Sequence, residues 1–323
     1  MDKTVPPGRV KGTLTPPCSK SYAQRALAAA LLSEEVSVLR NIEFCDDTRS
    51  ALQCIETLGA RVRRVDPTSL SIEGGLSPKG CVLNVGESGL STRLFTPVAS
   101  LCPTPVTIEG RGSLLRRPMQ MMFEPLRRLG VRVRDNGGFL PIEVCGPIQG
   151  GEAEVDGSVS SQFITGLLLA LPRLAGDSEI VVTTPLESRA YVELTRRVQR
   201  DFGVTSAWRN GGQTLLVRGG QEAVSPGTLH IEGDWSHAAF YLVAGAIGRG
   251  EIRLTGLDPQ SAQGDRAVVE ILRDMGADIT ESNFRDEAEP MCDLTIKYSR
   301  LHGVEIGGAI IPRLIDALPV IAG

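Results

Sequence analysis

Three hydrogen-bond donors, Lys20, Ser21 and Arg25, crowd one predicted helix start near the beginning of the sequence. Two prolines keep the preceding backbone extended, and the Ala- and Leu-rich run that follows is strongly helical, so Ser19 is expected to cap this helix. The first N–H groups of a helix are unpaired and carry the positive end of its dipole. Donor side chains at such a terminus predict an anion site, although a capped surface helix with ordinary cations shows the same pattern.

A glycine-containing loop and an Arg-Pro step supply a second group of candidates. In the run GESGLSTR, residues 86–93, Gly89 allows close approach of the backbone to a ligand, and Arg93 follows on the expected helix. The spacing is not that of a P-loop, which weakens the match to a phosphate loop. Arg117 precedes Pro118, a favourable first helical residue, and a forked guanidinium at a helix start suits a carboxylate or a phosphate.

A third group consists of neutral hydrogen-bonding residues in the middle of the chain. Ser160, Ser161 and Gln162 stand in series at a predicted helix start, where a cap alone needs only one of them. Ser188 and Tyr191 open the next predicted helix. Taken singly, the candidates are also explained as solvated cations, caps or half-buried packing. Taken together, they favour a shared site.

The elements that must position these residues form an internal repeat. A glycine ends a predicted helix at four places, spaced 71, 73 and 73 residues apart, and each time two predicted strands follow: Gly59, Gly130, Gly203 and Gly276. Each glycine suits a left-handed C-terminal cap. Upstream of each lies another helix that starts with small or polar residues and becomes apolar. The pattern predicts a mixed α/β unit of about seventy residues.

The end of the sequence interrupts this repeat. Five of the first helices but only four of the second are present, and the fifth first helix, IPRLIDALPVIAG, reaches residue 323. An apolar helix that faces no partner strand leaves its buried face uncovered. We therefore expect a shortened chain.

Bulk properties are those of an ordinary globular protein. The 323 residues have 41% hydrophobic content and a formal net charge of −4. A chain of this length can bury a large core and should form two domains or one extended domain. Because there is no run of eighteen apolar residues and no signal-peptide core, we expect a cytoplasmic protein without a membrane partner. Seven scattered cysteines indicate reduced thiols, and three histidines without ligand spacing argue against a metal. With 4% aromatics and an acidic balance, no nucleic-acid face is expected, and small anions are the favoured ligands.

These motifs resemble the 5-enolpyruvylshikimate-3-phosphate (EPSP) synthase family, the 3-phosphoshikimate 1-carboxyvinyltransferases, over the whole chain. The resemblance is carried by the P-x-S-K-S-x-x-x-R run, the glycine loop, the R-P step, and the S-S-Q, S-x-x-Y and IPRLIDALP runs. It implies an α/β fold of two lobes built from six βαβαββ repeats, of which about four and a half are present here. One complete lobe of three repeats would span residues 14–228, and the second, incomplete lobe would comprise residues 1–13 and 229–323.

The resemblance also implies a role for each matched residue. Shikimate 3-phosphate would be held by Lys20, Ser21, Arg25, Ser160, Ser161, Ser188, Tyr191 and Asp316. Phosphoenolpyruvate would be met by Lys20, Gly89, Arg117 and Gln162. Asp316 would act as the base toward the sugar-ring hydroxyl, with Lys20 as the second catalytic residue. No cofactor or metal is implied, and a monomer is expected.

The implied reaction transfers the enolpyruvyl group of phosphoenolpyruvate to the 5-hydroxyl of shikimate 3-phosphate and releases phosphate. Cations converging at helix N-termini would replace solvent around the two polyanions. The sequence departs from the family pattern at Cys18, where glycine is usual, and at Glu87, which places a negative charge near an anionic ligand. The family's ligands in the later repeats have no counterpart here.

Two alternatives remain open. UDP-N-acetylglucosamine enolpyruvyl transferase is similar in repeat and fold, but would show Lys-Asn in place of Lys20-Ser21 and a cysteine in the loop before Arg117. The other alternative is a substrate-binding repeat protein without turnover, which the missing end favours. Phosphate release with both substrates separates an enzyme from such a binder. We expect the 323-residue chain to bind shikimate 3-phosphate yet to turn over poorly or not at all.

Overall fold

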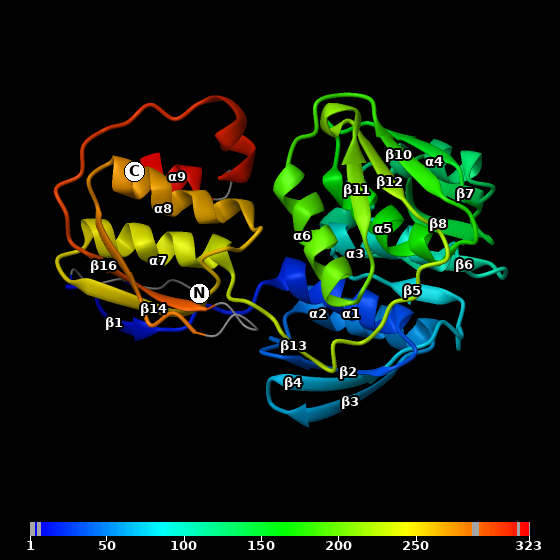
Figure 1. Cartoon of the computed structure of the whole chain (residues 1–323), viewed down its shortest axis with the longest axis horizontal. Helices are drawn as coiled ribbons and strands as arrows, with labels where there is room; N and C mark the ends of the chain where they lie inside the picture. Colours follow the sequence, from blue (N-terminus) through cyan, green and yellow to red (C-terminus); the bar gives the residue numbers. More distant parts are fainter. Residues whose placement is uncertain (1–3, 5–7, 286–290, 315–316, 323) are drawn as a thin grey trace. The chain divides into compact units, whose positions relative to one another are not determined.

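The computed structural model describes residues 4, 8–285, 291–314 and 317–322 (Figure 1). The chain divides into two compact units. One consists of Lys20–Ile231, and the other combines Met1–Ser19 with Glu232–Gly323. In the described part of the chain no helix has both the length and the apolar character needed to cross a membrane. Of the four sheets that the described residues form, three belong to the unit Lys20–Ile231. Every candidate site residue from Lys20 to Tyr191 belongs to the same unit.

Two repeats of this unit are continuous in sequence. The first of them contains β5 (Val82–Asn84), α3 (Gly89–Ala99), β6 (Val106–Glu109), η1 (Gly112–Arg116), η2 (Gln120–Met122), α4 (Phe123–Arg128), β7 (Arg132–Asn136) and β8 (Phe139–Cys145). The next contains β9 (Glu152–Val155), α5 (Ser161–Ala170), η3 (Leu171–Arg173), β10 (Ser178–Val182), α6 (Arg189–Asp201), β11 (Ser206–Arg209), η4 (Asn210–Gly212) and β12 (Thr214–Val217). Their strand orders are β5-β6-β8-β7 and β9-β10-β12-β11.

The remaining two repeats take their first strand from a distant part of the chain. One contains α1 (Lys20–Leu32), β2 (Val36–Arg40), α2 (Asp46–Leu58), β3 (Arg61–Asp66) and β4 (Ser69–Glu73), and its sheet is completed by β13 (Thr228–His230). The other contains α7 (Trp235–Ile247), β14 (Glu251–Leu257), η5 (Gly264–Ala267), α8 (Val268–Asp274), β15 (Asp278–Ser282) and β16 (Cys292–Lys297), and its sheet is completed by β1 (Lys11–Leu14).

All four sheets share one topology. The first two strands of each sheet are parallel, as in β5 with β6 or β13 with β2, and the last two strands add antiparallel. In the two continuous repeats a helical crossover joins the parallel strands, and short turns join the antiparallel pairs β3-β4 and β7-β8. The predicted mixed α/β fold with a repeated βαβαββ unit is thus confirmed.

The glycine after each second helix has the backbone conformation that its position predicts. The φ angle is 131° at Gly59, 81° at Gly130, 73° at Gly203 and 94° at Gly276. L-residues with side chains rarely adopt these values, whereas glycine does so without a steric penalty. Each glycine lets the chain leave the helix and enter the following strand.

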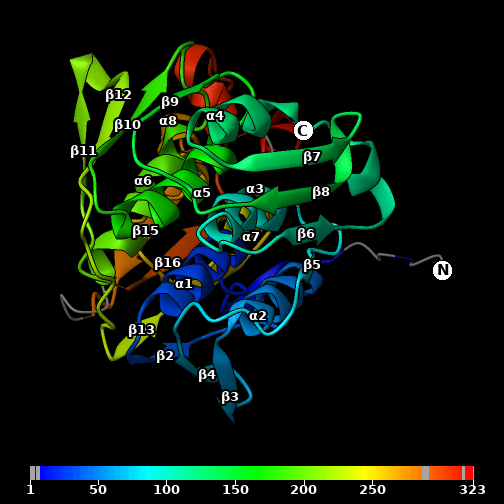
Figure 2. The same ribbon diagram turned by 90° about the vertical axis from the view of Figure 1, so that its right-hand side faces the viewer.

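The first helices of the repeats form the interior of the unit Lys20–Ile231, and the sheets lie outside them (Figure 1, Figure 2). In α1, every residue from Tyr22 to Leu32 is buried. In α3 only Arg93 is not buried, and in α5 only Gln162 is not. Helices that are apolar on all sides belong in a core. Their polar residues are therefore concentrated at their starts.

The predicted helix at the end of the sequence is interrupted. A 3-10 helix, η6 (Gly308–Arg313), is followed by a short helix, α9 (Leu318–Ala322). Pro312 lies inside η6 and has no backbone N–H to donate, which disfavours a continuous α-helix through this position. Asp316, the predicted base, lies outside the described residues.

Candidate functional site

Polar side chains join the starts of the three interior helices. The Oε1 atom of Gln24 in α1 accepts hydrogen bonds from Ser88 Oγ at 3.4 Å and Ser91 Oγ at 3.3 Å, at the start of α3. Arg93 Nη1 in α3 donates to Gln162 Oε1 in α5 at 3.1 Å. A buried polar group without a hydrogen-bond partner destabilises the folded protein. These hydrogen bonds therefore fix the helix starts relative to one another.

The backbone of Gly89 lies against two arginines and a glutamine. A Cβ atom built at Gly89 would lie 2.9 Å from Arg93 Nη1, 3.3 Å from Arg117 Nη1 and 3.8 Å from Gln162 Oε1. We call Gly89, Arg93, Arg117 and Gln162 the anion corner. The structure thus brings together three residues predicted to meet phosphoenolpyruvate and adds Arg93. A side chain at position 89 would push the guanidinium groups apart.

Electrostatics make the anion corner a site that favours an anion. Burial, and to a smaller extent the neighbouring Arg117 guanidinium, lower the pKa of Arg93. The buried Nε atom of Arg93 has no hydrogen-bond partner within the described residues. A positive charge that is partly desolvated and faces a like charge is stabilised by a bound anion. The arrangement therefore suits a carboxylate or phosphate group.

Arg117 reaches the anion corner from a loop, and our prediction that it lies at a helix start was wrong. The residue follows the 3-10 helix η1 and has extended backbone angles of φ −88° and ψ 128°. The α-helix begins only at Phe123. Pro118 accounts for the extended angles of Arg117, because a proline disfavours helical angles at the residue before it.

Arg25 is buried, with 1% of its surface exposed, and contacts three helices. Its Nε donates to Thr195 Oγ1 at 2.9 Å, its Nη1 to the Ser21 carbonyl at 2.7 Å, and its Nη2 to Thr165 Oγ1 at 3.2 Å. Nη2 also lies 3.4 Å from the Tyr191 carbonyl. Burial lowers the pKa of Arg25 to about 10, so the side chain remains charged at neutral pH. Within the protein, Arg25 thus positions Ser21 and Tyr191.

Lys20 is the first residue of α1, and its side chain is 56% exposed. Its Nζ atom lies 3.4 Å from Asp47 Oδ2 in the first turn of α2. Asp46 and Asp47 both lie in that first turn, and the N-cap position before them is Cys45, which makes no side-chain cap hydrogen bond. An exposed ion pair contributes little stability, roughly 0–1 kcal/mol. Lys20 can therefore exchange Asp47 for a ligand at low cost.

The serines of the third group lie at the starts of α5 and α6. Ser160 caps α5, and its Oγ accepts from the Gln162 N–H at 3.1 Å, while Ser161 is buried. Ser188 precedes α6 with φ 55° and ψ 35°, a left-handed conformation that costs free energy in a residue with a side chain. Tyr191 lies in the first turn of α6 and is half-buried.

A carboxylate links the two loops that carry these serines. Asp156 Oδ1 accepts from the Ser158 N–H at 2.9 Å, from Ser158 Oγ at 2.7 Å and from Thr184 Oγ1 at 2.5 Å. The hydrogen bond from Thr184, followed by those from Ser158, lowers the pKa of Asp156. The loop before α5 is thereby tied to the loop before α6.

Sequence reasoning missed the buried polar residues that connect the interior helices. Gln24, Thr165 and Thr195 are almost fully buried and bond across helix boundaries. A signal was available, because Gln24 and Thr165 interrupt helices that are otherwise apolar. Such isolated polar residues need a partner from another element.

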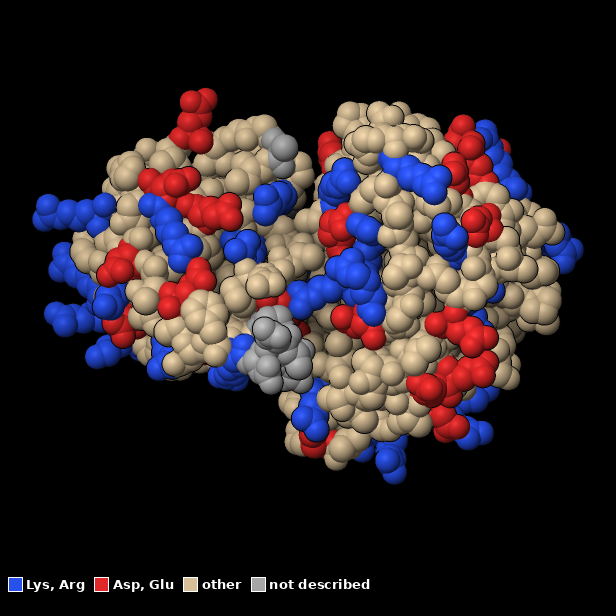
Figure 3. All heavy atoms as spheres, in the orientation of Figure 1, with Lys and Arg blue, Asp and Glu red and all other residues tan. Residues whose placement is uncertain are grey.

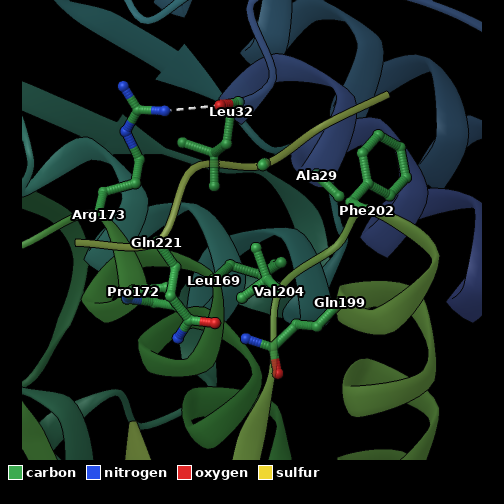
Figure 4. Close-up of a pocket in the computed structure, with 10 residues that line it drawn as sticks. Ala29, Leu32, Leu169, Pro172, Arg173, Gln199, Phe202, Val204 and Gln221 are labelled. Atoms are coloured by element: carbon green, nitrogen blue, oxygen red, sulfur yellow. Dashed lines mark hydrogen bonds between the residues drawn. The ribbon is translucent and has the colours of Figure 1, made fainter. Parts of the chain in front are cut away.

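A separate pocket lies at the opposite ends of the helices (Figure 4). It is lined by Ala29 and Leu32 of α1, Leu169 at the end of α5, and Gln199 of α6, among others. Arg173 Nη1 donates to the Leu32 carbonyl and Gln199 Nε2 to the Leu168 carbonyl, both at 2.6 Å. These donors satisfy carbonyls that helix ends leave unpaired. These polar groups of the pocket thus stabilise the helix ends.

Metal binding and disulfide chemistry find no site among the described residues. In the described ranges no group of three or more His, Cys, Asp or Glu residues is placed to hold a metal ion, and the seven cysteines are free thiols. Basic and acidic side chains are interspersed on the face seen in Figure 3. Attraction of an anion therefore depends on local clusters such as the anion corner.

Comparisons with known proteins point to one family. The family model for EPSP synthase (3-phosphoshikimate 1-carboxyvinyltransferase) matches residues 5–322. The 3-phosphoshikimate 1-carboxyvinyltransferase of Clostridium novyi is 35% identical, over 98% of this chain and 72% of the relative. That of Natronomonas pharaonis is 38% identical, over 99% of this chain and 75% of the relative. The EPSP synthase structure from Acinetobacter baumannii matches with a TM-score of 0.83 at 28% identity, covering 96% of this chain and 70% of that one.

Proposed function

The chain belongs to the EPSP synthase (3-phosphoshikimate 1-carboxyvinyltransferase) family, and we propose that it transfers the enolpyruvyl group of phosphoenolpyruvate to the 5-hydroxyl of shikimate 3-phosphate, releasing phosphate. The observation that carries the proposal is the anion corner, in which two guanidinium groups meet beside Gly89. Both proposed substrates are polyanions, so binding them together requires fixed positive charge. The match to the family extends over both units of the chain.

On the phosphoenolpyruvate side, we propose that Lys20, Gly89, Arg117 and Gln162 contact the substrate. The glycine leaves room for a ligand oxygen beside the backbone, and Arg117 offers a fork that matches a carboxylate or phosphate. Arg93 bonds to Gln162 and orients its amide group. Lys20, released from Asp47, would add a third positive charge.

On the shikimate 3-phosphate side, the proposed ligands are Lys20, Ser21, Arg25, Ser160, Ser161, Ser188, Tyr191 and Asp316. The link through Asp156, which joins the loops before α5 and α6, supports a shared site for the serines. Four hydrogen bonds of the Arg25 guanidinium already go to the protein, and the group has five N–H donors. Direct contact of Arg25 with substrate would use the remaining donor.

The chemistry consists of an addition followed by an elimination. The methylene carbon of phosphoenolpyruvate is protonated to a methyl group, and the 5-hydroxyl attacks the adjacent carbon. Phosphate then leaves that carbon as the methyl group loses a proton, which restores the double bond. Asp316 would accept the hydroxyl proton, and Lys20 would stabilise negative charge near the reacting groups. Donors held in place by the fold lower the barrier because they do not reorganise during the reaction.

We further propose two lobes, spanning residues 14–228 and residues 1–13 with 229–323, and a cytoplasmic monomer that takes both substrates from solution. The division of the chain at Lys20 and Ile231 into compact units supports two lobes with nearby bounds. The three sheets of the unit Lys20–Ile231 support one lobe of three repeats.

Phosphate release tests the proposed function. Phosphate should appear from phosphoenolpyruvate only when shikimate 3-phosphate is present, and UDP-N-acetylglucosamine should not replace it. Release with UDP-N-acetylglucosamine would favour the related transferase instead. The rate of phosphate release separately tests the expectation that the chain turns over poorly. A chain that binds no shikimate 3-phosphate and releases no phosphate would contradict the proposal.

A further inference from the structure

We propose that Glu87 is a positioning residue, which ties the loop of residues 110–117 to the start of α3 and thereby keeps Arg117 in the anion corner. The inference rests on the proposed function, since it concerns the phosphoenolpyruvate side of the same site. It concerns a residue at which the sequence departs from the family pattern and which, by its charge alone, would oppose an anionic ligand.

Two consecutive residues of the glycine loop hold the Arg117 loop. Glu87 Oε2 accepts from the Ser113 N–H and from Ser113 Oγ, both at 3.1 Å. The carbonyl of Gly86 accepts from the Arg111 N–H at 2.8 Å. The loop is thus fastened at two points, and one of them depends on a side chain.

The segment between this link and Arg117 has little freedom. Gly112 has φ 61°, and a Cβ atom there would overlap the Glu87 carboxylate, so the carboxylate lies directly against the backbone. Leu114 is fully buried, and its carbonyl accepts from the Arg117 N–H at 3.0 Å. The link at Ser113 is followed at once by a buried anchor, and Arg117 lies three residues beyond it.

The partners of Glu87 within this loop favour its ionised form. The hydrogen bonds from Ser113, and then the charges of Arg111 and Arg117, lower the pKa of Glu87. At neutral pH the carboxylate is ionised and bonded to Ser113. The negative charge therefore holds the loop that brings Arg117 to the anion corner.

The following repeat provides a matched control. Asp156 makes the same kind of link, because it ties the loop before α5 to Thr184 in the loop before α6. Those loops carry Ser160 and Ser188, which belong to the shikimate 3-phosphate side of the proposal. Loss of the Glu87 link and loss of the Asp156 link should therefore affect different substrates.

Hydrogen exchange tests the link directly in the full chain. In Glu87→Ala the amides of residues 110–117 should exchange faster than in the unaltered protein, whereas in Asp156→Ala they should not. Glu87→Gln should restore most of the protection, because its amide oxygen still accepts from Ser113. Unchanged exchange at residues 110–117 in Glu87→Ala would overturn the proposal.

Substrate affinity tests what the link does. With phosphoenolpyruvate titrated into protein saturated with shikimate 3-phosphate, Glu87→Ala should weaken binding about fivefold or more, while affinity for shikimate 3-phosphate stays within about twofold. Asp156→Ala should show the opposite pattern. Equal weakening of both substrates in Glu87→Ala would refute a positioning role.

The failures are distinguishable. If the unaltered protein binds neither substrate, the proposed function is wrong. The positioning role of Glu87 is then wrong too, even if hydrogen exchange shows that Glu87 holds Ser113. If the unaltered protein binds both substrates but Glu87→Ala retains full affinity for phosphoenolpyruvate, the proposed function stands and the inference about Glu87 is wrong.

Discussion

Arg25 carries its charge in the interior of the unit Lys20–Ile231, where hydroxyl and carbonyl oxygens take the place of water. Thr165 and Thr195, which accept its hydrogen bonds, also bond to each other at 2.9 Å. A guanidinium satisfied in this way joins α1, α5 and α6 at one point. Its contribution to the fold is thus separable from any contact with substrate.

Replacing Arg25 by Ala should therefore destabilise the protein. The variant loses charge-assisted hydrogen bonds and leaves a cavity, at a cost of about 2–4 kcal/mol in the free energy of unfolding. Arg61→Ala is the control, because Arg61 has 76% of its side chain exposed and forms only a surface ion pair with Glu73. Urea denaturation compares the two, and equal midpoints would contradict the structural role of Arg25.

Arg117 offers a prediction about binding. Arg117→Ala should weaken phosphoenolpyruvate binding much more than Arg111→Ala, because the Arg117 guanidinium lies in the anion corner, with Nη1 3.3 Å from a Cβ built at Gly89. The loss of a charge-assisted pair in the anion corner corresponds to about 2–3 kcal/mol. Titration of each variant with phosphoenolpyruvate at saturating shikimate 3-phosphate measures the difference. Similar losses in both variants would remove Arg117 from the site.

At the level of secondary structure, the starts of α1, α3 and α5 present the polar groups that form the candidate site. Their bodies are buried and mostly apolar, so the polar groups that remain accessible lie near their starts. Arg93 and Gln162 are the two residues of α3 and α5 that escape burial, and they bond to each other. Helix starts also supply unpaired N–H groups, which adds to their attraction for anions.

The close packing around Gly89, at the start of α3, leads to a further prediction. Gly89→Ala should weaken phosphoenolpyruvate binding with little effect on shikimate 3-phosphate, because the added Cβ lies 2.9 Å from Arg93 Nη1. Gly176→Ala is the matched control, since a Cβ there meets nothing within 4 Å. Calorimetry measures the affinity of both variants for phosphoenolpyruvate and for shikimate 3-phosphate. An unchanged affinity for phosphoenolpyruvate in Gly89→Ala would place the glycine loop away from the ligand.

The sequence was most informative where local chemistry decides the structure. Gly59 and its three counterparts predicted the helix ends correctly, because positive φ selects glycine. The place of Arg117 at a helix start was predicted wrongly, because Pro118 suits a first helical residue but does not itself start a helix, and α4 begins only at Phe123. The partners of Gln24 could not be predicted, since they depend on how helices distant in sequence pack. Likewise, β13 is only three residues long and leaves too short a pattern to reveal its pairing with β2.

Considered as a whole, the protein uses carboxylates to hold its loops in place, and this predicts a dependence of stability on pH. Glu87 and Asp156 have pKa values below their ordinary 4.5 and 3.8 because they accept hydrogen bonds when ionised. Their contribution is present above those ordinary values and is lost as the pH falls through the lower folded pKa. Burial raises the pKa of Asp201, so the contribution of this carboxyl group to stability has the opposite dependence on pH.

The double variant Glu87→Gln with Asp156→Asn should therefore lose stability less steeply between about pH 5 and pH 3 than the unaltered protein. Amides keep an acceptor oxygen but do not titrate in this range. Thermal denaturation at a series of pH values provides the comparison. Parallel curves for the two proteins would show that these carboxylates do not contribute to the pH dependence.

The central claim, that the substrates bind at the starts of the interior helices, is tested most directly by hydrogen exchange with and without shikimate 3-phosphate. Protection should increase at residues 19–25, 158–162 and 186–191, and addition of phosphoenolpyruvate should extend it to residues 86–93 and 110–117. The pocket at the other helix ends, around Arg173 and Gln221, should be unaffected. Protection confined to that pocket, or absent from all the helix starts, would contradict the claim.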